Sequence, residues 1–469
     1  MVKSLNNLVG LLNEFLWSYV LIGLLISLGI YFTLKTNFVQ FRYFKEMFKL
    51  LSEQTDTEHG KKGISPFQAF SISAASRIGT GNMAGVALAI AIGGPGSVLW
   101  MWIIALIGSS SSFIESTLGQ IYKVKDGDEF RGGPAYYIEQ ALNKRWLGVL
   151  FSILITISFG FVFNSVQANT ISSAFEQAFG IKTSITGIVL VVLSGIIIFG
   201  GIKRIANVSS IIVPIMALIY VGVAIFIMIK NITFIPEMIK MIFTNAFGVN
   251  QALGGTLGGV MMQGIKRGLF SNEAGMGSVP NAAAAADTSH PVKQGLIQTL
   301  GVFTDTLLVC SATAFIILLS GIHNNPGDLT GIQLTQAAVS SQVGSWGDSF
   351  IAISIFLFAF SSIIGNYYYG ETNIEFIKSS KSALFIYRVI VLSMVMLGSV
   401  AKLSTVWDMA DLFMGLMAVI NLIVIAKLGP IAYEALKDYT RQRKEGKNPV
   451  FKASSIPELE NIEQWKDEI

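Results

Sequence analysis

Runs of about 20 mostly apolar residues recur along almost the whole chain, and they constrain its fold more than any other feature. A helix of that length crosses the hydrocarbon core of a bilayer, where every backbone polar group must be satisfied within the segment. Eleven such runs are separated by charged or turn-rich segments. Their expected limits are 15–34, 66–93, 97–121, 147–172, 184–201, 207–229, 252–286, 293–320, 347–371, 384–402 and 405–427. The sequence therefore predicts an all-α integral membrane protein with 11 transmembrane helices.

The composition agrees with lipid as the solvent. Hydrophobic residues make up 52% of the chain and charged residues 13%, and the mean hydropathy is +0.60. The net charge of +4 is small and dispersed, so nucleic acid is not an expected partner. Cys310 is the single cysteine, which excludes an intramolecular disulfide and a cysteine metal cluster.

Lysine and arginine gather in alternate loops of this arrangement. Cytoplasmic loops of membrane proteins carry an excess of basic residues. With the amino terminus outside, the cytoplasmic segments hold 25 of the 33 basic residues and the outside segments hold 5. Those cytoplasmic segments are 35–64, 122–146, 202–206, 287–293, 372–388 and the tail after 426. We therefore expect an outside amino terminus and a cytoplasmic carboxy terminus.

The second and seventh spans are long, polar at their centres and interrupted by glycines. Placing residues 77–85 over 267–275 aligns Arg with Arg, Asn with Asn, Ala with Ala and Gly with Gly, four matches in nine positions. The offset from the second to the seventh span is five, an odd number, so the second copy is inverted in the membrane. Paired interrupted helices in two inverted halves point to the binding site of a transporter.

The sequence therefore predicts a five-plus-five inverted repeat of spans 2–6 and spans 7–11, with two discontinuous helices. The expected parts are a peripheral first span with an interfacial amphipathic helix (1–64), a first inverted repeat (65–230), a second inverted repeat (231–430) and a cytoplasmic tail (431–469). The tail is charged from Arg441 onward and lacks apolar periodicity, so we expect it to be partly disordered.

The interruptions suggest what such a site binds. Unwinding at 78–81 frees backbone N–H groups at the positive end of a half-helix, where a carboxylate can bind, and glycine permits its close approach. The carbonyls freed at 75–78 suit a dehydrated alkali cation. A break at Phe270, Ser271 and Asn272 in the seventh span offers carbonyls and an amide side chain to an ammonium group. A zwitterionic α-amino acid matches both ends.

Three strings of the sequence resemble the signatures of a known family. They are Ile78-Gly-Thr-Gly-Asn-Met-Ala-Gly-Val86, Gly132-Gly-Pro-Ala-Tyr-Tyr137 and Gly268-Leu-Phe-Ser-Asn-Glu-Ala-Gly-Met-Gly-Ser278. Through them the chain is similar, over roughly residues 10–440, to the alanine or glycine:cation symporters. The resemblance implies a leucine-transporter-type fold, sodium as the co-transported ion, and alanine or glycine as the substrate. It also implies the cytoplasmic membrane of a prokaryote.

The string at 79–82 also resembles the break in the first core helix of the neurotransmitter:sodium symporters. In that family the amides of the break receive the substrate carboxylate. Carbonyls before the break and hydroxyls of the eighth core helix, the ninth span here, hold a sodium ion. The substrate residues implied are Gly79, Thr80, Gly81 and Asn82, and the sodium ligands implied are Ala75, Ile78, Ser361 and Ser362. Arg77 departs from that family, which has a small residue there.

Further pocket residues are expected on the fourth and seventh spans. Gln167 and Asn164 could contact substrate or only bond between helices, as amides often do in bundles. Phe270 could be a lid that sets pocket volume or ordinary packing, Asn272 could bind substrate or tie off broken backbone, and Met276 flanks the break. Charged residues within the spans are expected to be paired. They are Arg77, Glu115, Arg267, Glu273 and Asp305.

Only a few other functions are compatible with the sequence. The sequence contains no His-Glu-x-x-His string or Walker-type phosphate loop, so we expect no enzyme and no nucleotide-driven pump. A proton-coupled or differently selective amino-acid carrier of the same fold stays open, and an ion channel is the remoter alternative. The expected partners are a small amino acid, sodium and the lipid bilayer, and a monomeric state is compatible with the sequence.

Overall fold

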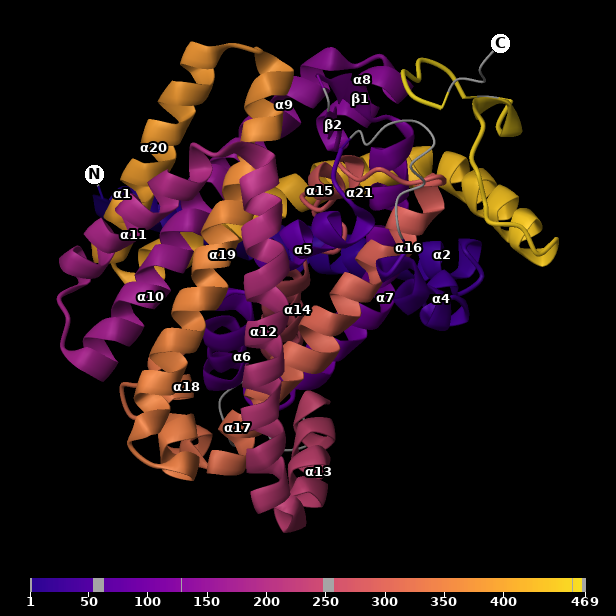
Figure 1. Cartoon of the computed structure of the whole chain (residues 1–469). Coiled ribbons are helices and arrows are strands. Elements are labelled where there is room, and N and C mark those ends of the chain that lie inside the picture. Colours follow the sequence, from indigo (N-terminus) through magenta and orange to yellow (C-terminus); the bar gives the residue numbers. More distant parts are fainter. Residues whose placement is uncertain (1, 54–62, 128, 248–256, 458, 466–469) are drawn as a thin grey trace.

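The computed structural model describes residues 2–53, 63–127, 129–247, 257–457 and 459–465. In these ranges the chain is built almost entirely of helices that pack into one bundle (Figure 1). The one sheet of the described residues is a small antiparallel hairpin of β1 (Val124–Asp126) and β2 (Glu129–Arg131).

Eight helices of the described residues are long and apolar enough to cross a membrane, and a bent pair adds a ninth span. The eight are Asn7–Lys35, Ser97–Ile121, Arg145–Phe179, Gly201–Lys230, Pro291–Ser320, Trp346–Ile377, Lys381–Val400 and Leu403–Lys444. The bent pair is α5 (Pro66–Arg77) with Gly81–Gly93, which consists of η3 (Gly81–Gly85) and α6 (Val86–Gly93). The prediction of a mostly helical protein with many apolar spans is therefore confirmed.

The two remaining expected spans are less regular. The helix α11 (Thr183–Ile198) is apolar but short. The seventh span consists of α14 (Leu257–Asn272), an irregular stretch and α15 (Pro280–Ala284). The count of eleven spans and the inverted repeat stay predictions.

Three long spans contain a π-helical segment between two α-helical segments. Their segments are α1 (Val2–Phe15), η1 (Leu16–Leu21) and α2 (Ile22–Lys35); α9 (Arg145–Ile155), η4 (Thr156–Phe163) and α10 (Asn164–Phe179); and α16 (Pro291–Val302), η7 (Phe303–Cys310) and α17 (Ser311–Ser320). The uninterrupted spans are α7 (Ser97–Ile121), α12 (Gly201–Lys230), α19 (Trp346–Ile377), α20 (Lys381–Val400) and α21 (Leu403–Lys444).

Shorter helices connect the spans. They are α3 (Val39–Arg42), α4 (Phe44–Leu51), α8 (Pro134–Leu142), α13 (Ile235–Ala246) and α18 (Gly331–Val343), with single 3-10 turns η5 (Ile232–Phe234), η8 (Ile322–Asn324) and η9 (Ala453–Ser455). The segment expected to form an interfacial helix is helical in α3 and α4, and α4 buries Met47 and Leu50 while Phe44 and Phe48 stay exposed.

The last helix differs from the prediction. It continues to Lys444, past the expected limits of 427 for the span and 431 for the tail, because residues such as Leu428, Ala432 and Leu436 keep an apolar face that is buried. The tail then folds back, and the Phe451 amide donates a hydrogen bond of 2.9 Å to the Ser289 carbonyl. This part of the tail thus contacts the bundle, and the expected partial disorder of the tail stays a prediction.

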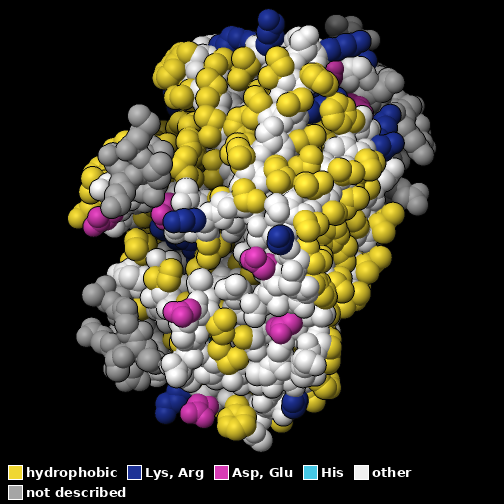
Figure 2. All heavy atoms as spheres, turned by 90° about the vertical axis from the view of Figure 1, so that its left-hand side faces the viewer, with side chains coloured by type: hydrophobic (Ala, Val, Ile, Leu, Met, Phe, Trp, Pro, Cys, Tyr) yellow, Lys and Arg dark blue, Asp and Glu magenta, His cyan; other side chains and the backbone are white. Residues whose placement is uncertain are grey.

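The two broken spans lie inside the bundle. In α7, which packs against one of them, 72% of the apolar membrane-crossing stretch is buried. In α12 only 28% of that stretch is buried. The helix α7 packs against α14 and α16, and α5 packs against α12 and α19. Figure 2 shows hydrophobic side chains gathered over much of one outer face, and α11 and α20 expose Ile188, Val192, Phe385 and Ile386. The polar, broken segments are thus enclosed while apolar surface faces outward, as a bilayer requires.

Candidate functional site

The first break begins where α5 ends. Ile78 takes an extended backbone conformation (φ −81°, ψ 90°), so the helix stops and the next amides turn away from it. The Gly79 N–H donates to Asn82 Oδ1 at 2.9 Å, and the Thr80 N–H donates to Gln167 Oε1 at 3.0 Å. Two of the amides predicted to receive a carboxylate therefore already face side-chain oxygens. A carboxylate oxygen that replaced the amide oxygen of Gln167 would meet the same donor.

Close packing explains the two glycines of this break. A Cβ atom at Gly79 would overlap Ser362 Oγ and lie 2.9 Å from Gln167 Oε1. A Cβ atom at Gly81 would lie 3.0 Å from the Ser271 Cα atom and 3.1 Å from the Phe270 ring. Any larger residue would displace the side chains that approach the break.

Oxygen atoms of α5 and α19 converge beside the same break. Ser362 Oγ lies 2.8 Å from the Ala75 carbonyl oxygen and 3.5 Å from the Ile78 carbonyl oxygen. Ser361 instead donates a hydrogen bond of 2.8 Å to the Phe358 carbonyl on its own helix. Of the four residues predicted to hold sodium, the structure brings three together. Carbonyl and hydroxyl oxygens at an unwound helix are the kind of ligands that bind sodium in transporters.

The second break lies later than predicted. The helix α14 continues through Phe270, Ser271 and Asn272, and the irregular backbone covers residues 273–279. Within it Glu273, Gly275 and Gly277 have left-handed φ angles of +58°, +85° and +83°. The prediction of a break at 270–272 was therefore wrong by about three residues, because side chains from distant helices determine where the backbone leaves the helix.

Those side chains are Glu115 and Asn421, which the sequence did not identify as site residues. Glu115 on α7 accepts hydrogen bonds from the Gly275 and Gly277 amides at 3.1 and 3.0 Å. Asn421 on α21 donates to Glu115 at 2.7 Å and to the Gly275 carbonyl at 2.9 Å. The carboxylate thus satisfies amides that a continuous helix would have bonded internally. Glu115 holds the break, and among the described residues it forms no ion pair with a basic side chain.

Asp305 on η7 connects the two broken spans. Its Oδ1 accepts hydrogen bonds from Asn82 Nδ2 at 2.7 Å and from Ser271 Oγ at 3.1 Å. Asn272 donates to Thr306 at 3.2 Å, and its side-chain oxygen accepts the Ala274 N–H at 3.0 Å. In this structure the Asn272 side chain therefore ties off broken backbone.

Aromatic rings stand next to Gly81. The Phe270 ring lies between Phe163 and Trp407, with ring centroids 4.6 Å from each.

Met276, another predicted pocket residue, is buried within the second break. Asn164, a predicted pocket residue, donates to the Gly160 carbonyl one turn earlier on its own span.

The buried basic residues of the two broken spans bond to two kinds of acceptor. Arg267 and Lys266 both bond Asp411 on α21, at 2.7 and 3.1 Å, as expected for paired charges. Arg77 donates to the Gln298 carbonyl and to Ser112, each at 3.1 Å, and forms no ion pair within the described ranges. The expected carboxylate partner of Arg77 is thus replaced by neutral oxygens.

Comparison with known proteins gives consistent results. A sequence model described as the sodium:alanine symporter family matches residues 2–453. The probable sodium/glutamine symporter GlnT of Bacillus subtilis is 58% identical over 465 residues, 99% of this chain and 97% of that protein. The sodium/alanine symporter AgcS of Methanococcus maripaludis is 37% identical over 94% of this chain and 99% of that protein.

The fold also has a counterpart among solved structures. A Na+-coupled sialic acid symporter in a substrate-bound outward-open state aligns with a TM-score of 0.52 at 16% identity. The alignment covers 83% of this chain and 86% of that chain. At this identity the likeness shows the fold alone.

Proposed function

Because the chain belongs to the sodium:alanine symporter family, we propose that it is a secondary active transporter that imports a small neutral amino acid, alanine or glycine, together with sodium. Sodium is the co-transported ion of this family, and transport by such a fold proceeds by alternating access. The observation that carries the proposal is the convergence of Ser362 Oγ with the Ala75 and Ile78 carbonyls beside an interrupted helix.

The substrate carboxylate is proposed to bind at the first break. The Thr80 N–H, now bonded to Gln167, would donate to the carboxylate, and Gly79 and Gly81 would allow its approach. The substrate ammonium would face Ser271, whose hydroxyl donates to the Asp305 carboxylate. Phe270 would limit the volume left for the side chain.

The proposed site of action is the cytoplasmic membrane, with the amino terminus outside. The distribution of basic residues in the sequence supports this orientation. With net inward movement of one positive charge, transport is electrogenic. A potential of about 100 mV supplies about 2.3 kcal/mol and a tenfold sodium gradient about 1.4 kcal/mol, which together sustain roughly several-hundred-fold accumulation.

Uptake of labelled alanine into proteoliposomes tests the proposal. An inward sodium gradient should drive uptake, and an inside-negative potential should increase it. Replacing sodium with potassium should abolish accumulation. Uptake that continues unchanged in potassium, or that follows an imposed pH gradient instead, would contradict sodium coupling and favour a channel-like or proton-coupled carrier.

Glutamine is a second candidate substrate. The similarity to the probable sodium/glutamine symporter of Bacillus subtilis, 58% over nearly the whole chain, favours it over other larger amino acids. Competition between labelled alanine and unlabelled glycine, alanine, glutamine and leucine would separate the two proposals. If glutamine competes more strongly than alanine, the pocket is larger than proposed.

A further inference from the structure

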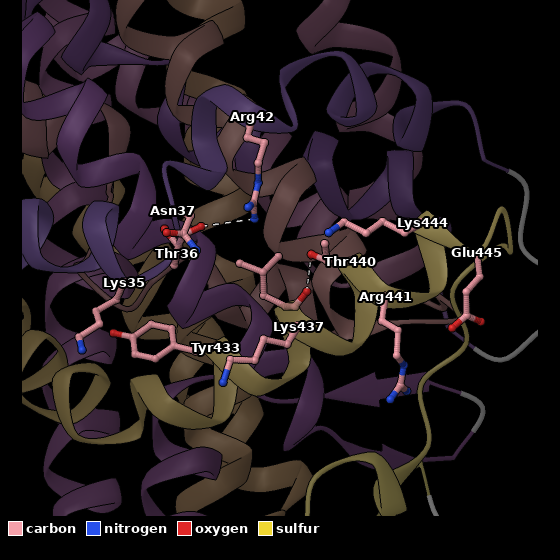
Figure 3. A pocket seen from close by; sticks show the side chains of 11 residues that line it. Lys35, Thr36, Asn37, Arg42, Tyr433, Lys437, Thr440, Arg441, Lys444 and Glu445 are labelled. Atoms are coloured by element: carbon pink, nitrogen blue, oxygen red, sulfur yellow. Dashed lines mark hydrogen bonds between the residues drawn. The ribbon is translucent and has the colours of Figure 1, made fainter.

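A basic cavity lies away from the broken spans, where the end of α2 and helix α3 meet the last turns of α21 (Figure 3). Its volume is about 590 Å³. Five basic side chains line it, against one acidic side chain, Glu445. The basic residues are Lys35, Arg42, Lys437, Arg441 and Lys444. So strong an excess of one charge around one cavity indicates an anionic ligand.

Two of these cations pair with a carboxylate, and the other three do not within the described residues. Lys437 pairs with Glu434 at 2.5 Å, and Arg441 pairs with Asp438. Lys35, Arg42 and Lys444 form no ion pair with a carboxylate in the part of the chain that the structure describes. Figure 3 shows the Arg42 and Lys444 side chains extending into the same space. Like charges brought together repel each other unless an anion lies between them.

The backbone brings Arg42 over this cavity. Asn37 and Phe38 take left-handed conformations, with φ of +52° and +56°, so the chain reverses sharply after α2 ends. Arg42 lies 3.5 Å from the Thr36 carbonyl, a long and weak contact. Its guanidinium group therefore keeps most of its donors available, and a planar guanidinium matches the oxygens of a phosphate.

The surroundings indicate that the anion belongs to a lipid. The apolar helix α2 ends at Lys35, so the cavity lies at the level of the membrane surface. Leu34, Phe38 and Phe41, which neighbour its lining residues Lys35, Asn37 and Arg42 in the sequence, are exposed, at 58%, 50% and 50%. A soluble anion would not cover the exposed parts of these apolar side chains, whereas acyl chains would. Basic pockets between membrane helices bind anionic lipid headgroups.

We propose that this cavity binds the phosphate headgroup of an anionic glycerophospholipid through Lys35, Arg42 and Lys444, with the acyl chains against the exposed apolar face of α2 and α3. The bound lipid would join the peripheral first span to the last span. The proposal is independent of the amino-acid site, because none of its residues takes part in that site.

Native mass spectrometry of the full-length protein, with phosphatidylglycerol added to the detergent solution, tests the proposal. The triple variant Lys35→Gln, Arg42→Gln and Lys444→Gln should lose retained phosphatidylglycerol. Each basic side chain near an anionic lipid surface contributes about fivefold to affinity, so three should contribute about a hundredfold. The matched control changes Lys144, Lys378 and Lys381 to Gln, three exposed lysines outside the cavity, and should retain the lipid.

Three results would overturn the proposal. The first is equal retention of phosphatidylglycerol by the cavity variant and the control. The second is equal retention of phosphatidylcholine and phosphatidylglycerol by the wild type. The third is displacement of the lipid by millimolar inorganic phosphate, which would show a site for a soluble anion. Thermal unfolding in lipid-free detergent should be the same for both triple variants, so that loss of lipid does not reflect loss of the fold.

Discussion

The Ser362 hydroxyl donates a hydrogen bond of 2.8 Å to the Ala75 carbonyl, across the interface between α19 and α5. If both oxygens hold sodium, Ser362→Ala removes one ligand and leaves the amides of the break intact. We expect the sodium half-saturation constant to rise about tenfold, equivalent to about 1.4 kcal/mol, with a smaller change in affinity for the amino acid at saturating sodium. Sodium-dependent binding of labelled alanine measures both constants.

Ser361→Ala is the matched control for this prediction, because its hydroxyl donates to the Phe358 carbonyl on its own helix instead of to α5. It should change the sodium constant much less than Ser362→Ala. An unchanged sodium constant in Ser362→Ala would assign its hydroxyl to helix packing. An equal effect of the two substitutions would mean that Ser361 reorients to bind the ion.

Phe270 is expected to limit the size of the substrate. Its ring fills the space between Phe163, Trp407 and Gly81, so Phe270→Ala should admit larger apolar amino acids while weakening alanine binding. Apolar pockets discriminate by about 1–3 kcal/mol per methylene, and rejection by a stiff wall can exceed that. Competition of labelled alanine by leucine in both proteins measures the change.

Loss of a buried phenylalanine costs about 3–5 kcal/mol of stability, so Phe270→Leu, which keeps most of the apolar volume, provides the comparison. Leucine should compete with alanine in Phe270→Ala more strongly than in Phe270→Leu. The same selectivity in the wild type and both variants would mean that Phe270 only packs, and that the size filter lies elsewhere in the pocket.

The first break could be predicted because its causes are local. Glycines at 79 and 81 weaken the helix, and a polar string in an apolar span marks an exception to lipid burial. The second break was located incorrectly because its causes are distant. Glu115 and Asn421 lie about 160 and 146 residues from Gly275 in the sequence, and their bonds to its amide and carbonyl appear only once α7, α14 and α21 are packed.

The partners of the charged residues in the spans are equally hard to predict from the sequence. Sequence reasoning expected Arg77 and Arg267 to be paired, but the sequence gives no sign that Asp411, 144 residues away, is the partner of Arg267. It also gives no sign that a carbonyl and a serine satisfy Arg77. Residue types therefore predict where the spans are interrupted, whereas the partners of their charged residues depend on helix packing.

Lys123, just after α7, should make stability depend on pH. Burial lowers the pKa of its amine from 10.5 to about 7, an effect opposed by nearby Asp287. Between pH 7 and 10 the unfolded chain therefore binds one more proton than the folded protein, and the free energy of unfolding should rise with pH by about 1.4 kcal/mol per unit from this residue. Thermal unfolding in detergent at pH 7 and pH 9 measures the trend.

Lys123→Met replaces the titrating amine with an apolar side chain of similar length. The pH-dependent gain in the free energy of unfolding should therefore be absent from the variant. The difference between the two proteins isolates Lys123 from other titrating residues. Parallel pH profiles would show that Lys123 stays charged in the folded protein, held by its hydrogen bond of 3.0 Å to the Ala286 carbonyl and by the Phe130 ring 4.1 Å away.

Gln167 offers the sharpest test of the carboxylate site. Its side-chain oxygen accepts the Thr80 N–H at 3.0 Å, the bond proposed for the substrate carboxylate. Gln167→Glu changes one amide to a carboxylate at nearly constant volume. If that carboxylate stays beside Thr80, it repels an incoming carboxylate at about 4 Å by about 4 kcal/mol at an effective dielectric constant near 20. Alanine binding should then weaken more than a hundredfold, while sodium binding is retained or strengthened.

Gln167→Met, similar in size but neutral, should weaken alanine binding far less. Equilibrium binding of labelled alanine and of labelled sodium at pH 8 measures both ligands in all three proteins. Equal alanine affinity in the wild type and Gln167→Glu would place the substrate carboxylate away from Thr80.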